Sequence, residues 1–382
     1  MKIALATVDL LRGRERLMPW RTVMEVAGYA RKAGHDAVVL TLPVAADNED
    51  YSCEGVPVRV APRDFAEFRN YVNSQGFDAL YYPTPWREGL KDLSAFASIT
   101  CRKIAYFPGG SVHFSNVWAL GNNVGLRVTK PYLADWLTPY GWTMAKLKDV
   151  GFSTVIAQSP YTAETCRKAG FGDVRMIVPG KDDFETLDEV PEILDKLNIK
   201  GKKYLLFTGA PAPIRGASLL LKAVDKAVCA DNSICCLFMM RRDVGADFGM
   251  FEKLYSQIIH KENMVISDMK LTRNELKTIV THARAVVLPF LLVPSEIPIT
   301  FFEVLSTGTP VVTFENGGTT DYLGDSVLAS APGKINGLAK NLLCIWQDDS
   351  LYGRLRNNAL SKMEDHPTWD AVSKLWLECV KK

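Results

Sequence analysis

Two carboxylates, Glu296 and Glu303, interrupt the otherwise apolar stretch VPSEIPITFFEVLSTGTPVV (residues 293–312). The sequence predicts a helix here that has Pro298 in its first turn, Gly308 just past its end and Glu303 about two turns along it. The unpaired N–H groups at the start of a helix attract anions and suit phosphate. A carboxylate close by can accept hydrogen bonds from sugar hydroxyls. The combination predicts a binding site for a nucleotide sugar.

Strand and helix patterns alternate on both sides of this stretch, and these elements must position the two carboxylates. In the first half of the chain, short apolar segments are predicted as strands: KIALATV (2–8), the segment after Gly34, FDALYYPTP (77–85), KIAYFPGG (103–110), STVIAQSP (153–160) and VRMIVPG (174–180). Helices are predicted at about 19–33 and after the strand at 153–160. This alternation favours a parallel sheet with helices on both faces.

The same pattern begins again after residues 181–203, a charged segment that reads as a linker with one short helix. Further strands are predicted at YLLFTG, SICCLFMM, NMVIS, ARAVVLPF and TPVVTFE, and the segment from about 347 to 382 is predicted to be helical. We therefore predict two doubly wound α/β domains, 1–180 and 181–365. Ligands of such domains bind beyond the carboxyl ends of the strands, so the cleft between the two domains is the expected site.

Composition and charge are those of a soluble globular protein of 382 residues, with 47% hydrophobic and 23% charged residues. A net charge of +2 gives no general attraction to nucleic acid. The N-terminal segment places its arginines after a short apolar run, unlike a signal peptide, and no apolar stretch reaches the ~20 residues of a membrane span. The eight cysteines are scattered, with no zinc spacing or disulfide pattern. Together these features predict reduced thiols, no metal site and a cytoplasmic location.

Several motifs in order resemble the retaining glycosyltransferases of the GT-B fold, in particular those of family 4. The signature of that family has two glutamates with seven residues between them, which run into EA-x-A-x-G-x-PVV; EVLSTGTPVV matches its second half, with Glu303 as the second glutamate. FSTVIAQSPYTAETCRKAGFGDVRMIVPG resembles the end of the N-terminal domain of these enzymes, and FTGAPAPIRGASLLLKAV resembles their donor-phosphate loop. The likeness covers residues 150–330 well and the first 120 loosely. It implies two Rossmann-like domains that face a cleft, with a last helix (366–382, opened by Trp369) that crosses back to the N-terminal domain.

The resemblance also implies roles for individual positions on the donor side. Glu303 would bind the ribose hydroxyls, Arg215 would take the place of a lysine that grips the diphosphate, and Gly209 would let the backbone approach that phosphate. The helix start would cover the diphosphate or the sugar. The donor-binding positions are then Glu303, Arg215, Gly209, Ser295, Pro298, Ile299 and Thr300.

Catalytic and acceptor-side positions follow from the same resemblance. His113, after FPGGSV, resembles a histidine that reaches the transferred sugar, and Glu296 is the candidate for the first glutamate of the signature. The acceptor side would include Arg12, Gly13 and Gly110. The aromatic-rich segment 118–142 reads as packing, with a lining of the acceptor side as the alternative.

This sequence departs from the family pattern within the signature, in the phosphate loop and in the N-terminal loop. The first signature glutamate falls at Ser295, so that Glu296 is one residue late, and Pro298 takes the place of a glycine. The arginine of the family's phosphate loop is replaced near Ala210, which leaves Arg215 unless Arg241 or Arg242 helps. The N-terminal Gly-Gly loop is replaced by LLRGRERLMP, whose basic residues read as a solvated loop or as a contact with an anionic acceptor or lipid head groups.

The expected activity is therefore hexosyl transfer with retention of configuration, without metal ion or cofactor, from a nucleotide-diphosphate sugar. The acceptor would be a glycan, a lipid-linked molecule or a small molecule, with peripheral contact with the inner membrane surface as one arrangement. Two alternatives stay open: a catalytically inactive relative that acts as a binding or scaffold protein, and a two-domain binder of small solutes. The missing signal sequence and the ordered motifs argue against the second alternative.

Overall fold

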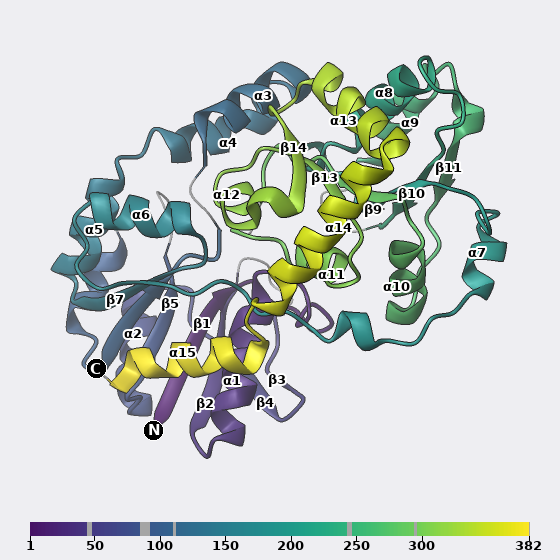
Figure 1. The fold of residues 1–382 in the computed structure, drawn as a ribbon. Helices are drawn as coiled ribbons and strands as arrows, with labels where there is room; N and C mark the ends of the chain where they lie inside the picture. The colour runs from purple at the N-terminus through teal and green to yellow at the C-terminus, as the bar shows by residue number, and fades with distance from the viewer. Residues whose placement is uncertain (44–47, 85–91, 110–111, 243–246, 294–295, 382) are drawn as a thin grey trace.

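A computed structural model describes the whole chain except residues 44–47, 85–91, 110–111, 243–246, 294–295 and 382 (Figure 1). The first half forms an eight-stranded sheet in the order β3-β4-β2-β1-β5-β6-β7-β8. All neighbours in it are parallel except β3 and β4, which form an antiparallel pair at the edge. The strands are β1 (Lys2–Val8), β2 (Asp36–Leu42), β3 (Tyr51–Cys53), β4 (Val56–Val60), β5 (Ala79–Pro83), β6 (Arg102–Tyr106), β7 (Phe152–Ala157) and β8 (Val174–Met176).

Helices cover both faces of this sheet. Its central strands are apolar along their whole length, so both faces must be shielded from water. The helices of the first half are α1 (Trp20–Lys32), α2 (Phe65–Gln75), α3 (Phe114–Val124), α4 (Leu126–Trp136), α5 (Tyr140–Asp149) and α6 (Pro160–Lys168). Helix α1 packs in a hydrophobic core on one face of the sheet. Helices α2, α5 and α6 pack in a second core on the other face. Helix α3 instead buries Ala119 and Leu120 in a core of the second half of the chain.

The second half forms a six-stranded, all-parallel sheet in the order β11-β10-β9-β12-β13-β14. Its strands are β9 (Leu205–Gly209), β10 (Cys236–Met240), β11 (Met264–Ser267), β12 (Ala285–Leu288), β13 (Val311–Phe314) and β14 (Val327–Ser330). Its helices are α7 (Glu192–Lys196), α8 (Ala217–Val228), α9 (Phe248–Tyr255), α10 (Arg273–Thr281), α11 (Ile299–Ser306), α12 (Thr319–Leu323), α13 (Ile335–Gln347) and α14 (Asp349–Glu364). Helices α8, α9 and α13 pack on one face of the sheet, and α7, α10, α11 and α14 pack on the other. The prediction of two doubly wound α/β domains is thus confirmed.

The last helix, α15 (Trp369–Lys381), returns to the N-terminal sheet and lies beside α1, as the resemblance implied (Figure 1). Trp376 is fully buried there, and its ring lies 5.3 Å from the rings of both Tyr81 and Tyr106. Trp369 opens the helix and is itself buried. The aromatic side chains of α15 therefore close the core over this face of the first sheet.

The chain passes between the two sheets twice, and the two crossings run side by side. The Lys181 N–H donates to the Pro367 carbonyl at 2.9 Å, and the His366 ring lies 2.8 Å from the Pro179 carbonyl. Gly180 is needed at this crossing, because a Cβ on it would lie 2.7 Å from the Trp369 backbone. The expected boundaries at residues 180 and 365 fall at these crossings, and the division into domains stays a prediction.

Two predicted elements differ from those in the structure. Helix α11 begins one residue after Pro298, which is its N-cap, so Glu303 is its fifth residue and lies little more than one turn along it. The segment 118–142, interpreted as aromatic packing or as a lining of the acceptor side, is largely helical, and no helix was predicted there. None of the described helices is long and apolar enough to cross a bilayer.

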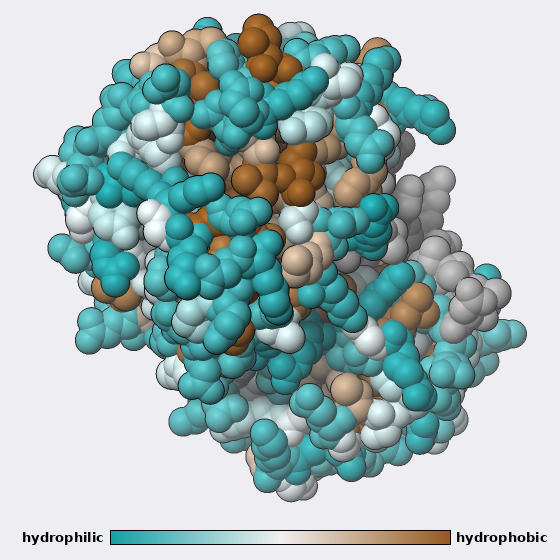
Figure 2. All heavy atoms as spheres, turned by 90° about the vertical axis from the view of Figure 1, so that its right-hand side faces the viewer, coloured by the Kyte–Doolittle hydropathy of each residue, from teal (hydrophilic) through white to brown (hydrophobic). Residues whose placement is uncertain are grey.

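Figure 2 shows the molecule from the right-hand side of Figure 1, a face on which hydrophilic side chains predominate and apolar ones form small separate groups.

Candidate functional site

Gly209 and Arg215 meet at the carboxyl end of β9, in the middle of the second sheet. The Arg215 guanidinium lies over Gly209, where a Cβ would be 2.8 Å from its Nη1 atom, and 5.8 Å from the centre of the Phe290 ring. The backbone at Gly209 has φ of +136°, a conformation that only glycine adopts without strain. The loop after β9 thus brings a cation directly over the end of the strand.

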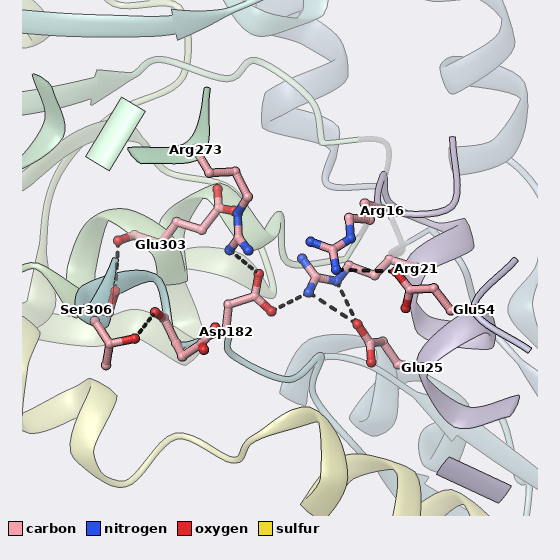
Figure 3. A network of polar contacts seen from close by, with 10 residues as sticks. Arg16, Arg21, Glu25, Glu54, Asp182, Arg273, Glu303 and Ser306 are labelled. Carbon is pink, nitrogen blue, oxygen red and sulfur yellow. Dashed lines mark hydrogen bonds and ion pairs between the residues drawn. The ribbon is translucent and has the colours of Figure 1, made fainter. Parts of the chain in front are cut away.

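Glu303 lies in the adjacent helix α11, and its carboxylate points toward the gap between the two sheets (Figure 3). The side chain is partly buried. Burial, together with the negative charge of Asp182, raises the pKa of Glu303 to about 7, although the positive charges of Arg21, Arg273 and Arg241 act in the opposite direction. The carboxyl group is therefore close to half-ionised near neutral pH, among three arginines.

Asp182 binds two of these arginines, Arg21 and Arg273, and lies in the first crossing between the sheets (Figure 3). It accepts a hydrogen bond from Arg21 of α1, and its other oxygen lies 2.8 Å from Arg273, the first residue of α10. Arg21 also contacts Glu25 at 3.2 Å and lies over the Trp369 ring at 5.2 Å. The side chains of Arg21 and Asp182 are only 7% and 8% exposed, so this ion pair is shielded from water.

Sequence reasoning missed the arginine–aspartate network, although one signal was present. Thr272 and Glu275 form a capping box that begins α10 directly after β11, and this start places Arg273 at the same edge of the sheet as Arg215. For Arg21 and Asp182 there was no such signal, because their meeting depends on how the two sheets are placed against each other.

The start of α11 lies at the junction of the two halves. Pro298, Ile299 and Thr300 are all partly buried, and the N-cap residue Pro298 offers no side-chain hydrogen bond to the free N–H groups of the helix. Ile299 packs against apolar cores of both halves. Ser295 falls outside the described residues. The N-terminus of α11 thus faces the N-terminal domain, as a site between the domains requires.

Glu296 reaches across the junction and is almost completely buried, with 1% of its surface exposed. Its carboxyl group lies at the N-terminus of α6, close to Ser159, Thr162 and the backbone of Gln158. Burial raises the pKa of Glu296 to about 8, and these hydrogen-bonding groups lower it only in part. Neither carboxyl oxygen has a hydrogen-bond partner of normal geometry within the described residues. The loop itself is fixed by Thr319, whose hydroxyl donates to the Glu296 carbonyl at 2.9 Å.

His113, the N-cap residue of α3, makes the second contact across the junction. Its ring lies 3.9 Å from the Tyr161 ring and so close to Gly317 that a Cβ there would overlap it. Burial lowers the pKa of His113, although Asp321 acts to raise it. Next to it, Asn116 donates to the Glu315 carbonyl at 2.8 Å. Glu296 and His113 therefore both lie in tightly packed contacts between the two halves of the chain.

The acceptor-side candidates lie in the loop after β1. Arg12 lies 3.6 Å from Glu49 and over the Tyr51 ring, and Gly13 has φ of +88°. The other two arginines of this loop are also paired: Arg14 with Asp9 and Arg16 with Glu54. Gly110 falls outside the described residues. The described part of this loop is therefore close to electrically neutral.

Of the other basic candidates, Arg242 forms an exposed ion pair with Asp268 at 2.6 Å, whereas Arg241 contributes positive charge at Glu303. The described ranges contain no group of three or more His, Cys, Asp or Glu residues placed to hold a metal ion. The structure thus brings Gly209 and Arg215 together and places Glu303 beside Arg241. It holds His113 and Glu296 at the contact with the N-terminal domain.

Comparisons with known proteins agree with this architecture. Residues 189–362 match the family model described as glycosyl transferases group 1. No curated protein matches the sequence.

Solved structures similar to this chain include sucrose-phosphate synthase from Thermosynechococcus elongatus, with a TM-score of 0.76 and 16% identity over 100% of this chain and 98% of the other. A glycosyltransferase from Rickettsia africae has a TM-score of 0.69 and 13% identity over 100% and 97%. Anabaena Alr3699/HepE in complex with UDP-glucose has a TM-score of 0.69 and 14% identity over 100% and 99%. The fold is therefore GT-B, as the resemblance inferred from the motifs implied.

Proposed function

We propose that this chain, with its GT-B fold and its match to glycosyl transferases group 1 over residues 189–362, is a glycosyltransferase that uses a nucleotide-diphosphate sugar and retains the configuration of the transferred sugar. The observation that carries the proposal is the carboxyl group of Glu303, directed into the gap between the domains with arginines around it. The similar Anabaena protein was solved with UDP-glucose, which supports a uridine nucleotide as the donor.

On the donor side, Glu303 would accept hydrogen bonds from the ribose hydroxyls. The diphosphate would lie between Arg215, held over Gly209, and the uncapped N–H groups of α11. Pro298, Ile299 and Thr300 surround this helix start, and Ser295 is proposed to join them. These groups are fixed before the substrate arrives and so can stabilise the charge of the leaving diphosphate without reorganisation.

In the proposed reaction, the bond from the anomeric carbon to the diphosphate oxygen breaks as the acceptor oxygen bonds to the same face of that carbon. The acceptor proton passes to the departing diphosphate, so neither a cofactor nor a metal ion enters the scheme. His113 and Glu296 are the proposed catalytic side chains at the transferred sugar, and Arg12, Gly13 and Gly110 are the proposed acceptor side.

Domain opening is part of this proposal, because Glu296 is buried and His113 is partly buried in contacts between the domains. The two crossings at 179–182 and 366–368 are adjacent and form a natural hinge. Opening would admit the substrates, and closure would exclude the water that hydrolyses the donor. The acceptor is proposed to be a glycan, a lipid-linked molecule or a small molecule, and the location to be cytoplasmic, with peripheral contact with the inner membrane surface.

A catalytically inactive binding or scaffold protein is the second candidate. Ser295 at the position of the first signature glutamate favours it, as does the burial of Glu296 against α6. A protein of that kind would bind no donor, or would bind it without turnover.

Thermal-shift measurements with UDP-, GDP-, ADP- and TDP-sugars separate the two candidates. A matching donor stabilises the folded protein by about 2.7 kcal/mol when present at about 100 times its dissociation constant. We expect one nucleotide to raise the melting temperature and the others to leave it unchanged. Binding of one nucleotide without slow hydrolysis or transfer of its sugar would favour the inactive relative.

Substitution of Glu303 tests the donor site directly. We expect Glu303→Ala to weaken donor binding by about 1.5–3 kcal/mol, the contribution of hydrogen bonds to a charged group. Because the pKa of Glu303 is about 7, binding by the native protein should also strengthen as pH rises through this value, whereas Glu303→Gln should show a flat dependence. Titration calorimetry measures both effects, with the exposed Glu252→Gln on α9 as control. Unchanged affinity of Glu303→Ala would exclude the donor assignment.

A further inference from the structure

Large apolar side chains are concentrated on one exposed part of the molecule. Of the fifteen that the described residues leave exposed, six lie within residues 114–142. They are Phe114, Trp118, Leu126, Trp136, Leu137 and Trp142. The exposed fractions reach 62% for Trp118, 72% for Trp142 and 79% for Leu126. Such a concentration is unusual for a surface that meets only water.

Five of these side chains belong to the helices α3, α4 and α5, and Leu137 directly follows α4. The three helices run along the upper left of Figure 1, away from the face shown in Figure 2. On α3 and α4 the side chains also touch each other, since the Phe114 ring lies 6.0 Å from Trp118 and 4.7 Å from Trp136. The opposite side of α3 is fixed to the protein core by Val117 and Leu120, both buried. The exposed aromatic rings are thus held outward by helices that cannot turn them inward.

Basic residues outnumber acidic ones on this surface. Between residues 112 and 148, Asp135 is the only acid, while Arg127 and Lys130 are both exposed on α4. Neither cation forms an ion pair in the part of the chain that the structure describes, in contrast to the paired arginines of the loop after β1. We call the six apolar residues together with Arg127 and Lys130 the α3–α5 face.

We propose that the α3–α5 face binds the surface of a membrane that contains anionic lipids. Tryptophan side chains favour the boundary between lipid head groups and acyl chains, because the indole ring is apolar and its N–H group can still reach water or head groups. Arg127 and Lys130 would add attraction to the negative surface. Helix α3 begins at His113, so the membrane surface would lie next to the entrance of the proposed site.

A second copy of this chain fits the same face less well. In a symmetric dimer the patch would pack against itself, which brings the two cations of each copy into one interface with only one acid, Asp135, from each copy. An anionic lipid surface supplies the opposite charge.

Co-sedimentation with vesicles tests this proposal on the full-length protein, independently of any donor or acceptor. We expect the native protein to bind vesicles of phosphatidylcholine with phosphatidylglycerol, and to bind pure phosphatidylcholine at least about tenfold more weakly, the effect of about 1.4 kcal/mol. Added salt should weaken binding to the anionic vesicles.

Two double variants separate the apolar and ionic contributions. Trp118→Ala with Trp142→Ala should reduce binding to anionic vesicles by about tenfold or more. Arg127→Glu with Lys130→Glu should abolish the preference for anionic lipid. Leu360→Ala with Leu375→Ala, at exposed leucines on α14 and α15, is the matched control and should bind as the native protein does. All three should keep the native circular dichroism spectrum, since the replaced side chains are exposed.

The result that would overturn the proposal is native protein that stays in the supernatant with anionic vesicles, or binding that the tryptophan variant retains in full. A dimer detected by light scattering that the tryptophan variant abolishes would assign the face to a second copy instead. Loss of donor binding with intact vesicle binding would affect only the proposed function.

Discussion

Replacement of Arg21 by methionine is expected to destabilise the protein by about 3 kcal/mol. Removal of one partner from a buried ion pair costs about 3–5 kcal/mol, since the other charge stays buried without compensation. Arg21 and Asp182 are both nearly buried, but Arg273 remains 2.8 Å from Asp182, which places the expected loss at the lower end. Urea denaturation followed by circular dichroism measures it.

Arg273→Met is the matched control, because Arg273 binds the same carboxylate but its side chain is 38% exposed. Solvent screens such a contact, so its loss should cost only about 1 kcal/mol. Asp182→Asn combined with Arg21→Met should recover part of the stability, since both members of the pair are then uncharged. A loss below about 1 kcal/mol for Arg21→Met would show that this contact does not hold the domains together.

The same substitution should also affect the donor site. Arg21 lowers the pKa of Glu303, and Asp182 raises it. Without Arg21 the Glu303 pKa should rise further, so the pH at which donor binding strengthens should move upward. The stability of the hinge and the ionisation of the proposed ribose ligand are therefore coupled through one network.

The second large effect concerns the pH dependence of stability and the carboxyl group of Glu296. Its pKa is raised from 4.5 to about 8, mainly by burial. The folded protein thus keeps this proton while the unfolded chain has already released it, and stability falls as pH rises from about 4.5 to about 8. At about 1.4 kcal/mol per pKa unit, the change is on the order of 5 kcal/mol.

Glu296→Gln should remove this contribution, because the amide is neutral at every pH. We expect the variant and the native protein to have similar stability near pH 4.5, and the variant to become more stable as pH approaches 8. The difference in unfolding free energy between the two at each pH is the quantity to measure, since it cancels other groups such as Glu303. A difference that does not change with pH would place the carboxyl group of Glu296 in contact with water, in a domain arrangement more open than this one.

Much of the fold followed from local patterns in the sequence. Apolar strand segments, Pro298 at the start of α11 and Gly308 just beyond its end fixed the order of elements and the edge at which the site lies, because these signals depend on neighbours in the chain. Gly209 and Arg215 were named from the family resemblance, and one strand and one turn of local sequence bring them together. The helical character of 118–142 was not readable, because its tryptophans and other apolar residues do not follow the pattern of a helix with one buried face.

Only the tertiary structure decided which residues surround the carboxyl groups of Glu296 and Glu303. The order of residues placed Glu296 just before a helix and Glu303 within it, and the sequence by itself determined that much, together with the GT-B resemblance. Glu296 lies buried at the N-terminus of α6, and Glu303 has Arg21 and Asp182 near it; all of these partners are more than a hundred positions away in the chain. The ionisation of these carboxyl groups and their contacts with the other domain depend on burial and on distances between atoms. The packing of the two domains against each other determines both.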